Sequence, residues 1–197
     1  MDEKRDASEL FKTWAGFVAR ILVRTGVPES DLDDAVQEVF LVAHRRGGFV
    51  PCGASEKTWL AEIALRVAAN VRRSHRRRPT VHDDAAMEML ASGAPDPHAS
   101  TELRERLARV GEALETIAPE PRLVFVLIEL SGMSADEVAR ERGVPIGTVY
   151  SRLHTARKAF RACYEEKAPR REPGLLRSLG ERLSLSLETS AKKELAR

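Results

Sequence analysis

The second half of the chain carries hydrogen-bonding and cationic side chains whose spacing suits contact with nucleic acid. Residues 134–160 read SADEVARERGVPIGTVYSRLHTARKAF, and their second part combines an apolar stripe with a polar face at helical spacing. The polar face consists of Tyr150, Ser151, Arg152, His154, Thr155, Arg157 and Lys158. Polar side chains near a helix start can hydrogen-bond to base edges in a major groove, and neighbouring cations can bind phosphates.

Local signals predict a helix-turn-helix that would hold this face in place. Ser134 and Glu137 have the spacing of a capping box, in which each side chain bonds to a backbone amide at the helix start. Gly143 stands where the first helix needs a left-handed residue, and Pro145 follows as a stop. An ordinary helical hairpin with a solvated basic face is the alternative interpretation.

The distribution of charge favours a polyanion as partner more than the net charge does. The chain has 32 lysines and arginines against 30 acids, a net charge of +2. Residues 72–78 nevertheless contain five arginines, whereas residues 79–100 contain none and include four acids. Such segregation allows local binding of a polyanion by a nearly neutral chain.

Several classes of function are disfavoured by composition and spacing. Cys52 and Cys163 are far apart and outside any metal-ligand spacing, so neither a disulfide framework nor a metal site is predicted. The five histidines are scattered, and no glycine loop has the residues that cradle a phosphate. We therefore expect no catalytic residues and no cofactor. The charged N-terminus and the lack of a long apolar run predict a cytoplasmic protein without membrane insertion.

Helical periodicity runs through almost the whole chain, with no alternation typical of strands. The predicted fold is all-α: two small helical domains joined by an acidic linker, the second ending in the helix-turn-helix. The predicted boundaries are 8–78 and 101–166 for the domains and 79–100 for the linker. Residues 167–197 form an extension, in which Leu175, Leu176, Leu179 and Leu183 predict either an amphipathic helix or a frayed tail.

Three helices are expected in the first domain. The inward face of the first comprises Leu10, Phe11, Trp14, Phe17, Val18, Ile21 and Leu22. The second is DLDDAVQEVFLVAHRR, capped by Ser30 or Asp31, with its acids and cations placed to complement the helix dipole. The third runs from about Thr58 to Arg77.

Two separated segments resemble one family. DLDDAVQEVFLVAHR and TWLAEIALRVAANVRRSHRRR resemble the second domain of bacterial sigma factors. IAPEPRLVFVLIELSGMSADEVARERGVPIGTVYSRLHTARKAF resembles their fourth domain. The resemblance covers about residues 8–165 in the family's order. Because no third domain intervenes, the chain resembles the extracytoplasmic-function (ECF) group.

The resemblance implies a set of partners. These are core RNA polymerase, through its β′ clamp helices and β flap, promoter DNA, and an anti-sigma factor. The clamp-helix surface of the family matches Asp34, Gln37, Glu38, Phe40 and Leu41. An acidic stripe with an apolar edge complements a coiled coil bearing arginines. The alternative is that the acids of this stripe only complement the helix dipole.

The third helix and the loop before it correspond to the family's promoter-melting surface. A melted element needs a site for an unstacked base and a cationic track for the freed strand. The resemblance assigns these roles to Phe49, Thr58, Trp59, Arg66, Asn70, Arg73 and Arg77, with Arg76 as a further cation. Trp59 is equally explained as a core residue. Where the family often has Asn and Asp, this chain has Arg66 and Asn70, so its base preference is not predicted.

The last helix corresponds to the reader of the upstream promoter element. Its predicted DNA contacts are Gly147, Thr148, Tyr150, Ser151, Arg152, His154, Thr155 and Arg157. One of the two arginines can instead support the fold. Tyr150 and Thr155 replace cations common in the family, which predicts a shallower salt dependence and a different sequence preference.

The hypothesis from sequence is a sigma factor that binds core polymerase, recognises two promoter elements and promotes strand opening. A stand-alone helix-turn-helix regulator explains residues 134–160 but leaves DDAVQEVF and the arginine-rich third helix unexplained. A protein-interaction module that sequesters a regulator is a second alternative. An enzyme is the least supported.

Overall fold

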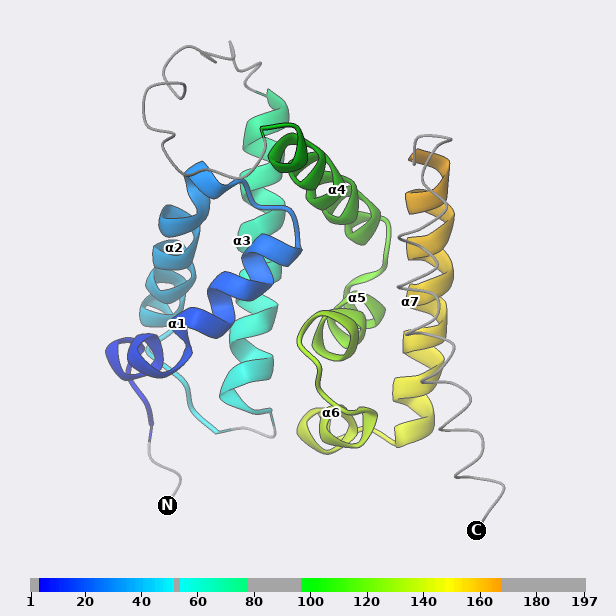
Figure 1. Cartoon of the computed structure of the whole chain (residues 1–197). Coiled ribbons are helices and arrows are strands. Elements are labelled where there is room, and N and C mark those ends of the chain that lie inside the picture. Colours follow the sequence, from blue (N-terminus) through cyan, green and yellow to red (C-terminus); the bar gives the residue numbers. More distant parts are fainter. Residues whose placement is uncertain (1–3, 52–53, 78–96, 168–197) are drawn as a thin grey trace. The chain divides into compact units, whose positions relative to one another are not determined.

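A computed structural model describes residues 4–51, 54–77 and 97–167 of the 197-residue chain. Over these ranges the regular structure is helical, apart from one backbone bridge between Arg5 and Phe49 (Figure 1). The all-α prediction is therefore confirmed. The predictions for the linker before residue 97 and for the extension after residue 167 lie outside the described residues. Everything described up to Tyr164 belongs to one compact unit.

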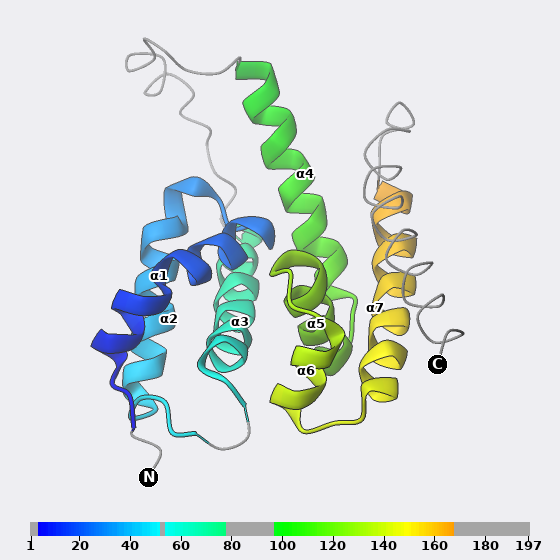
Figure 2. The same ribbon diagram turned by 60° about the horizontal axis from the view of Figure 1, so that its bottom comes forward.

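The first helix group contains α1 (Ala7–Arg24), the 3₁₀ turn η1 (Glu29–Asp31), α2 (Leu32–Arg45) and α3 (Glu56–Arg77). Asp6 and Glu9 form a capping box at the start of α1. The three α-helices contact one another, and α1 crosses the other two in both ribbon views (Figures 1 and 2). Their core is made of apolar side chains at helical spacing, including Leu10, Val18, Ile21, Leu22, Val39, Leu60, Ile63 and Val67.

Three details of this group differ from the sequence prediction. Phe11 is 44% exposed rather than inward-facing. Its ring packs edge-to-face with the buried Phe40 ring, with 5.0 Å between the ring centroids. Asp31 occupies the N-cap of α2 but makes no capping hydrogen bond, because its carboxylate bonds to His75 instead. Helix α3 begins at Glu56, two residues before the predicted start.

The second helix group contains α4 (Pro97–Glu115), α5 (Pro119–Phe125), the π-helical turn η2 (Val126–Leu130), α6 (Ala135–Arg142) and α7 (Ile146–Lys167). Pro119 stands at the first position of α5, where a missing amide hydrogen costs nothing. Its core comprises Leu114, Ile117, Leu123, Val124, Val126, Leu127, Val138, Val149, Leu153 and Ala156.

The predicted helix-turn-helix is confirmed. The Ser134–Glu137 capping box starts α6, and Gly143 ends it in the left-handed region at φ 61°. Hydrogen bonds from the backbone and hydroxyl of Ser134 lower the pKa of Glu137 below its ordinary value. Val149, Leu153 and Ala156 bury the inner side of α7, as their spacing predicts.

A buried arginine joins the two groups. Arg72 of α3 is 8% exposed, and its guanidinium donates to the Thr25 carbonyl at 2.5 Å and to Glu115 of α4 at 3.1 Å. Arg76 donates to the other oxygen of Glu115 at 2.8 Å. Gly111 of α4 lies so close that a Cβ there would be 2.6 Å from the Thr25 carbonyl oxygen.

The absence of a side chain at Gly111 is therefore a packing requirement. We expect Gly111→Ala to lower the free energy of unfolding by about 1–3 kcal/mol, because the added methyl overpacks rigid backbone. Gly147→Ala is the matched control, since a Cβ at Gly147 meets nothing within 4 Å in a helix. Urea unfolding measures both variants, and equal stability of the two would contradict the close contact.

The Glu115 carboxylate makes the stability of this junction depend on pH. Burial opposes its ionisation, but the hydrogen bonds and charges of Arg76 and Arg72 outweigh burial and lower the pKa of Glu115. A lowered folded-state pKa stabilises the fold above the unfolded-state value, and the contribution disappears as pH falls through the folded-state value.

We expect Glu115→Gln to lower the melting temperature at pH 7, and the difference from the natural chain to shrink in acid, below about pH 4. Thermal unfolding across this pH range measures the effect, with the exposed Glu29→Gln as control. A difference that stays constant with pH would show that Glu115 acts without its charge.

Candidate nucleic-acid and polymerase interfaces

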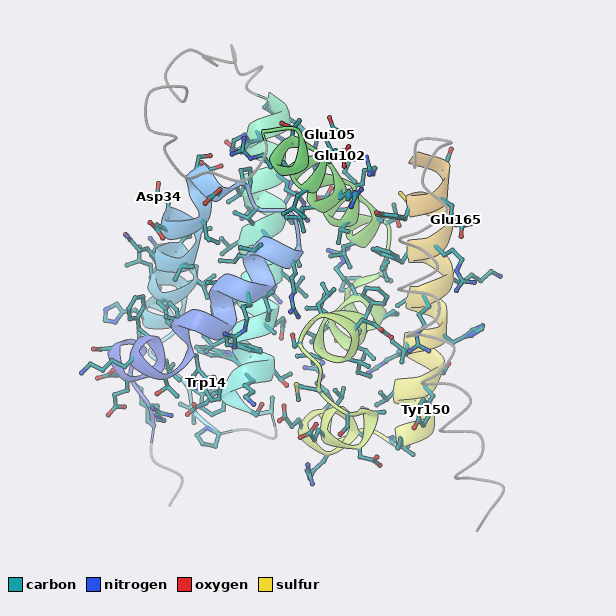
Figure 3. The ribbon with its side chains drawn as sticks, in the orientation of Figure 1. Trp14, Asp34, Glu102, Glu105, Tyr150 and Glu165 are labelled. Carbon is teal, nitrogen blue, oxygen red and sulfur yellow. The ribbon has the colours of Figure 1, made fainter. Side chains whose placement is uncertain are left out.

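The residues predicted to bind polymerase occupy the outer side of α2. Asp34, Gln37 and Leu41 are exposed at i, i+3 and i+7, so they share one face. Figure 3 shows Asp34 projecting from α2. Glu38 beside them is partly exposed and pairs with Arg45 at 3.1 Å. Phe40 is only 6% exposed, so its ring supports this face from below and does not form part of the surface.

A groove of about 640 Å³ runs between α2 and α3. Asp34 and Glu38 line its α2 side, and Arg66 and Asn70 line its α3 side, above an apolar floor that includes Val67. The groove therefore joins part of the predicted polymerase surface to part of the predicted melting surface.

The cations of α3 divide into two sets with different surroundings. Arg66, Asn70, Arg73 and Arg77 are exposed and recur at steps of four, three and four residues, which places them on one face. Asn70 accepts a hydrogen bond from Arg73 at 2.7 Å, and Arg66 pairs with Glu62 at 2.5 Å. The other set, Arg72 and Arg76, holds Glu115. The first set is the one available to phosphates.

The start of α3 is more enclosed than the sequence suggests. Phe49 is 5% exposed and Thr58 is fully buried. The Phe49 ring packs against Trp59 at 5.6 Å between centroids. The hydroxyls of Ser55 and Thr58 both donate to the carboxylate of Glu141 in α6. In this structure Phe49 cannot stack on a base, and Trp59 is the partly exposed aromatic of the pair.

The start of α7 presents the predicted upstream-element residues at the surface. The exposed residues are Gly147, Tyr150, Ser151, His154 and Thr155, and Tyr150 is 37% exposed. Figure 3 shows Tyr150 near the start of α7. Thr148 is partly exposed. Thr155 donates to the Ser151 carbonyl at 3.0 Å, which orients its hydroxyl along the helix. This surface offers hydroxyl, phenol and imidazole groups and few free cations.

Both predicted arginines of α7 have acidic partners within the fold. Arg157 donates to Glu129 at 2.9 Å and 2.5 Å, and the two side chains are 15% and 16% exposed. Arg152 lies 3.2 Å from Glu120, which also accepts from Arg142 at 3.1 Å. Arg157 thus ties α7 to η2, which is the supporting role that the sequence left open for one arginine.

The predicted melting surface has three neighbours that the sequence did not indicate, namely Arg5, Glu56 and Glu141. Each makes its contact across 42 or more residues of sequence, so no local pattern reveals it. Among the described residues, no group of three potential metal ligands gathers. The described helices also include none with the length and apolarity needed to cross a bilayer.

Comparison with known proteins identifies the family of the chain. The model described as Sigma-70 region 2 matches residues 10–78, and the model described as Sigma-70, region 4 matches residues 107–160. The ECF RNA polymerase sigma-E factor of Escherichia coli (strain K12) is 34% identical over 146 residues, which cover 71% of this chain and 76% of that protein. The chain belongs to the ECF sigma factors of RNA polymerase.

Another curated protein and a solved structure are also similar to this sigma factor. The sigma-E factor of Haemophilus influenzae is 29% identical over 168 residues, which cover 79% of this chain and 86% of that protein. The solved structure of CnrH in complex with the cytosolic domain of CnrY is 25% identical, with a TM-score of 0.49, and the match covers 82% of this chain and 89% of that one. The region 2 match includes α1–α3, and the region 4 match includes α5 and α6. The predicted family membership is confirmed.

The Arg157–Glu129 pair allows a test of which α7 cations support the fold of this sigma factor. We expect Arg157→Ala to lower the free energy of unfolding by about 1–3 kcal/mol, because a nearly buried carboxylate loses its partner. Lys158→Ala removes an exposed cation next to it and serves as control, with a change of less than about 0.5 kcal/mol. Denaturant unfolding measures both. An Arg157→Ala variant as stable as the control would free Arg157 for a direct role in DNA binding.

Proposed function

We propose that this sigma factor docks on core RNA polymerase through α2 and reads promoter DNA with α3 and α7. The observation that carries the proposal is the proximity of two complementary surfaces in the first helix group. The acidic side of the α2–α3 groove adjoins an exposed cationic face of α3, and a helix-turn-helix belongs to the same compact unit.

Polymerase docking uses the outer face of α2. Asp34 and Glu38 supply negative charge, Gln37 a hydrogen-bonding amide, and Leu41 an apolar edge that is 48% exposed. This combination complements a helical surface rich in arginine, such as the β′ clamp helices. Phe40 contributes by supporting the neighbouring side chains, because its ring is buried.

Recognition of the upstream element uses the start of α7. Tyr150, Ser151, His154 and Thr155 are exposed where a recognition helix meets base edges. With Arg157, and in part Arg152, engaged by acids of the fold, few cations remain for phosphates. Binding at this element therefore relies more on hydrogen bonds and apolar contact than on counterion release, and its salt dependence is shallow.

Strand opening uses the face formed by Arg66, Asn70, Arg73 and Arg77, with Trp59 as the stacking side chain. The energy of binding to DNA separates the strands. The protein acts in the cytoplasm as a subunit of the polymerase, and it catalyses no reaction and needs no cofactor of its own. An anti-sigma factor that covers these surfaces would keep it inactive. A stand-alone helix-turn-helix regulator does not account for the region 2 match.

Run-off transcription with core polymerase on genomic fragments tests the proposal. We expect discrete start sites that require both the polymerase and this chain. Binding of the chain to the same promoters without polymerase, together with no specific start, would favour a stand-alone regulator.

The α2 surface is tested by reversing its charge. We expect the double variant Asp34→Lys, Glu38→Lys to lose affinity for core polymerase at least tenfold, because two attractions become repulsions. The control is Glu29→Lys, Asp33→Lys, which reverses two exposed acids of the same segment. Fluorescence anisotropy with labelled chain measures both. Equal affinities of the two variants would exclude this face as the docking surface.

A further inference from the structure

One arginine holds both ends of the connection between α2 and α3. The Arg5 amide donates to the Phe49 carbonyl at 3.0 Å, and the Phe49 amide donates to the Arg5 carbonyl at 2.9 Å. The Arg5 guanidinium also donates to both carboxylate oxygens of Glu56, at 3.1 Å and 2.9 Å. Phe49 lies shortly after α2, and Glu56 is the first residue of α3. Arg5 therefore fixes where the connection begins and where it ends.

The backbone half of this contact requires a glycine beside it. Gly48 has φ +85°, and a Cβ there would lie 2.4 Å from the Arg5 carbonyl oxygen. A side chain at Gly48 would push the Arg5 segment away from Phe49. The close approach of the two backbones therefore depends on glycine at position 48.

The side-chain part of the Arg5 contact is a hydrogen-bond network centred on Glu56. Glu56 is 16% exposed and accepts a further hydrogen bond from the Trp14 indole at 2.6 Å. The second terminal nitrogen of Arg5 donates to the Thr13 hydroxyl at 3.0 Å. A planar guanidinium can serve the carboxylate and the hydroxyl at once, whereas an ammonium acts as a single point charge. The network secures the start of α3 to α1.

The residues held by this network lie next to Trp59, the stacking side chain of the proposed melting surface. Phe49 packs against Trp59, and the Lys57 ammonium lies 5.2 Å from the centre of the Trp14 ring. Glu56 would place a negative charge three residues before Trp59, and the Arg5 guanidinium offsets that charge. Position and charge at the start of α3 therefore both depend on Arg5.

We propose that Arg5 is a positioning residue for promoter opening, acting through Phe49 and Glu56 to set the start of α3. The proposal rests on the assignment of α3 to strand opening. Arg5 itself need not touch DNA. Arg5 therefore affects the rate of open-complex formation on a duplex promoter and does not affect the rate on a template whose strands are already separated.

The test compares two templates in transcription with core polymerase. One is a duplex promoter found in the run-off assay, and the other carries a mismatched, already open downstream element. We expect Arg5→Ala to slow open-complex formation on the duplex roughly tenfold, as loss of one charge-assisted contact to a carboxylate would. On the open template we expect a rate within about twofold of the natural chain, since the step that needs positioning is bypassed.

Matched variants separate positioning from charge and from folding. Arg5→Lys keeps the charge but lacks the second terminal nitrogen that reaches the Thr13 hydroxyl while the first holds Glu56, so we expect a loss on the duplex. Lys12→Ala removes an exposed cation of α1 and should leave both rates unchanged. Glu56→Ala should produce the same template-dependent loss, and adding it to Arg5→Ala should cause little further change, because the two residues act through one contact.

Two outcomes would overturn the proposal. Unchanged opening of the duplex by Arg5→Ala would exclude positioning. An equal loss on both templates, accompanied by a lower melting temperature or weaker polymerase binding, would assign Arg5 to the stability of the fold. Failure of the natural chain itself to support specific initiation on either template would instead contradict the proposed function.

Discussion

The described fold depends on burying the guanidinium of Arg72 with its charge satisfied. Burial lowers the pKa of Arg72, while Glu115 opposes that effect. A guanidinium keeps its charge in proteins. An unpaired charge at this position would cost several kcal/mol, so the Thr25 carbonyl and the Glu115 carboxylate must both reach it. This requirement brings the end of α1, the second half of α3 and the end of α4 together, and Gly111 leaves the space for them.

The arginines of this sigma factor fall into two groups, those paired within the fold and those exposed on its surface. Arg72, Arg122 and Arg157 have backbone or carboxylate partners within the fold, and burial lowers the pKa of Arg122 as it does that of Arg72. Arg73 and Arg77 project from α3 at exposed positions. A run of arginines in one helix therefore serves two purposes, because successive residues point in different directions around the axis.

The surfaces proposed to meet the promoter are supported from beneath rather than built from isolated side chains. Phe40 supports the exposed face of α2, and Phe49 supports Trp59. Glu141 of α6 satisfies the hydroxyls at the start of α3, so the two helix groups also meet at that end. Side chains held from below lose less conformational entropy on binding, which favours specific recognition.

The helices, both ends of α6 and the family could be predicted from sequence, because periodicity, end signals and motifs depend on residues close together in the chain. The Ser134–Glu137 box, the left-handed Gly143 and the stripe of Val149, Leu153 and Ala156 are examples. Which of the predicted site residues reach the surface could not be predicted from sequence, because it depends on long-range packing. Phe49 and Thr58 are buried and Arg157 is paired, because partners distant in sequence pack against them. Periodicity identifies the face of a helix, whereas only the packed fold shows what covers it.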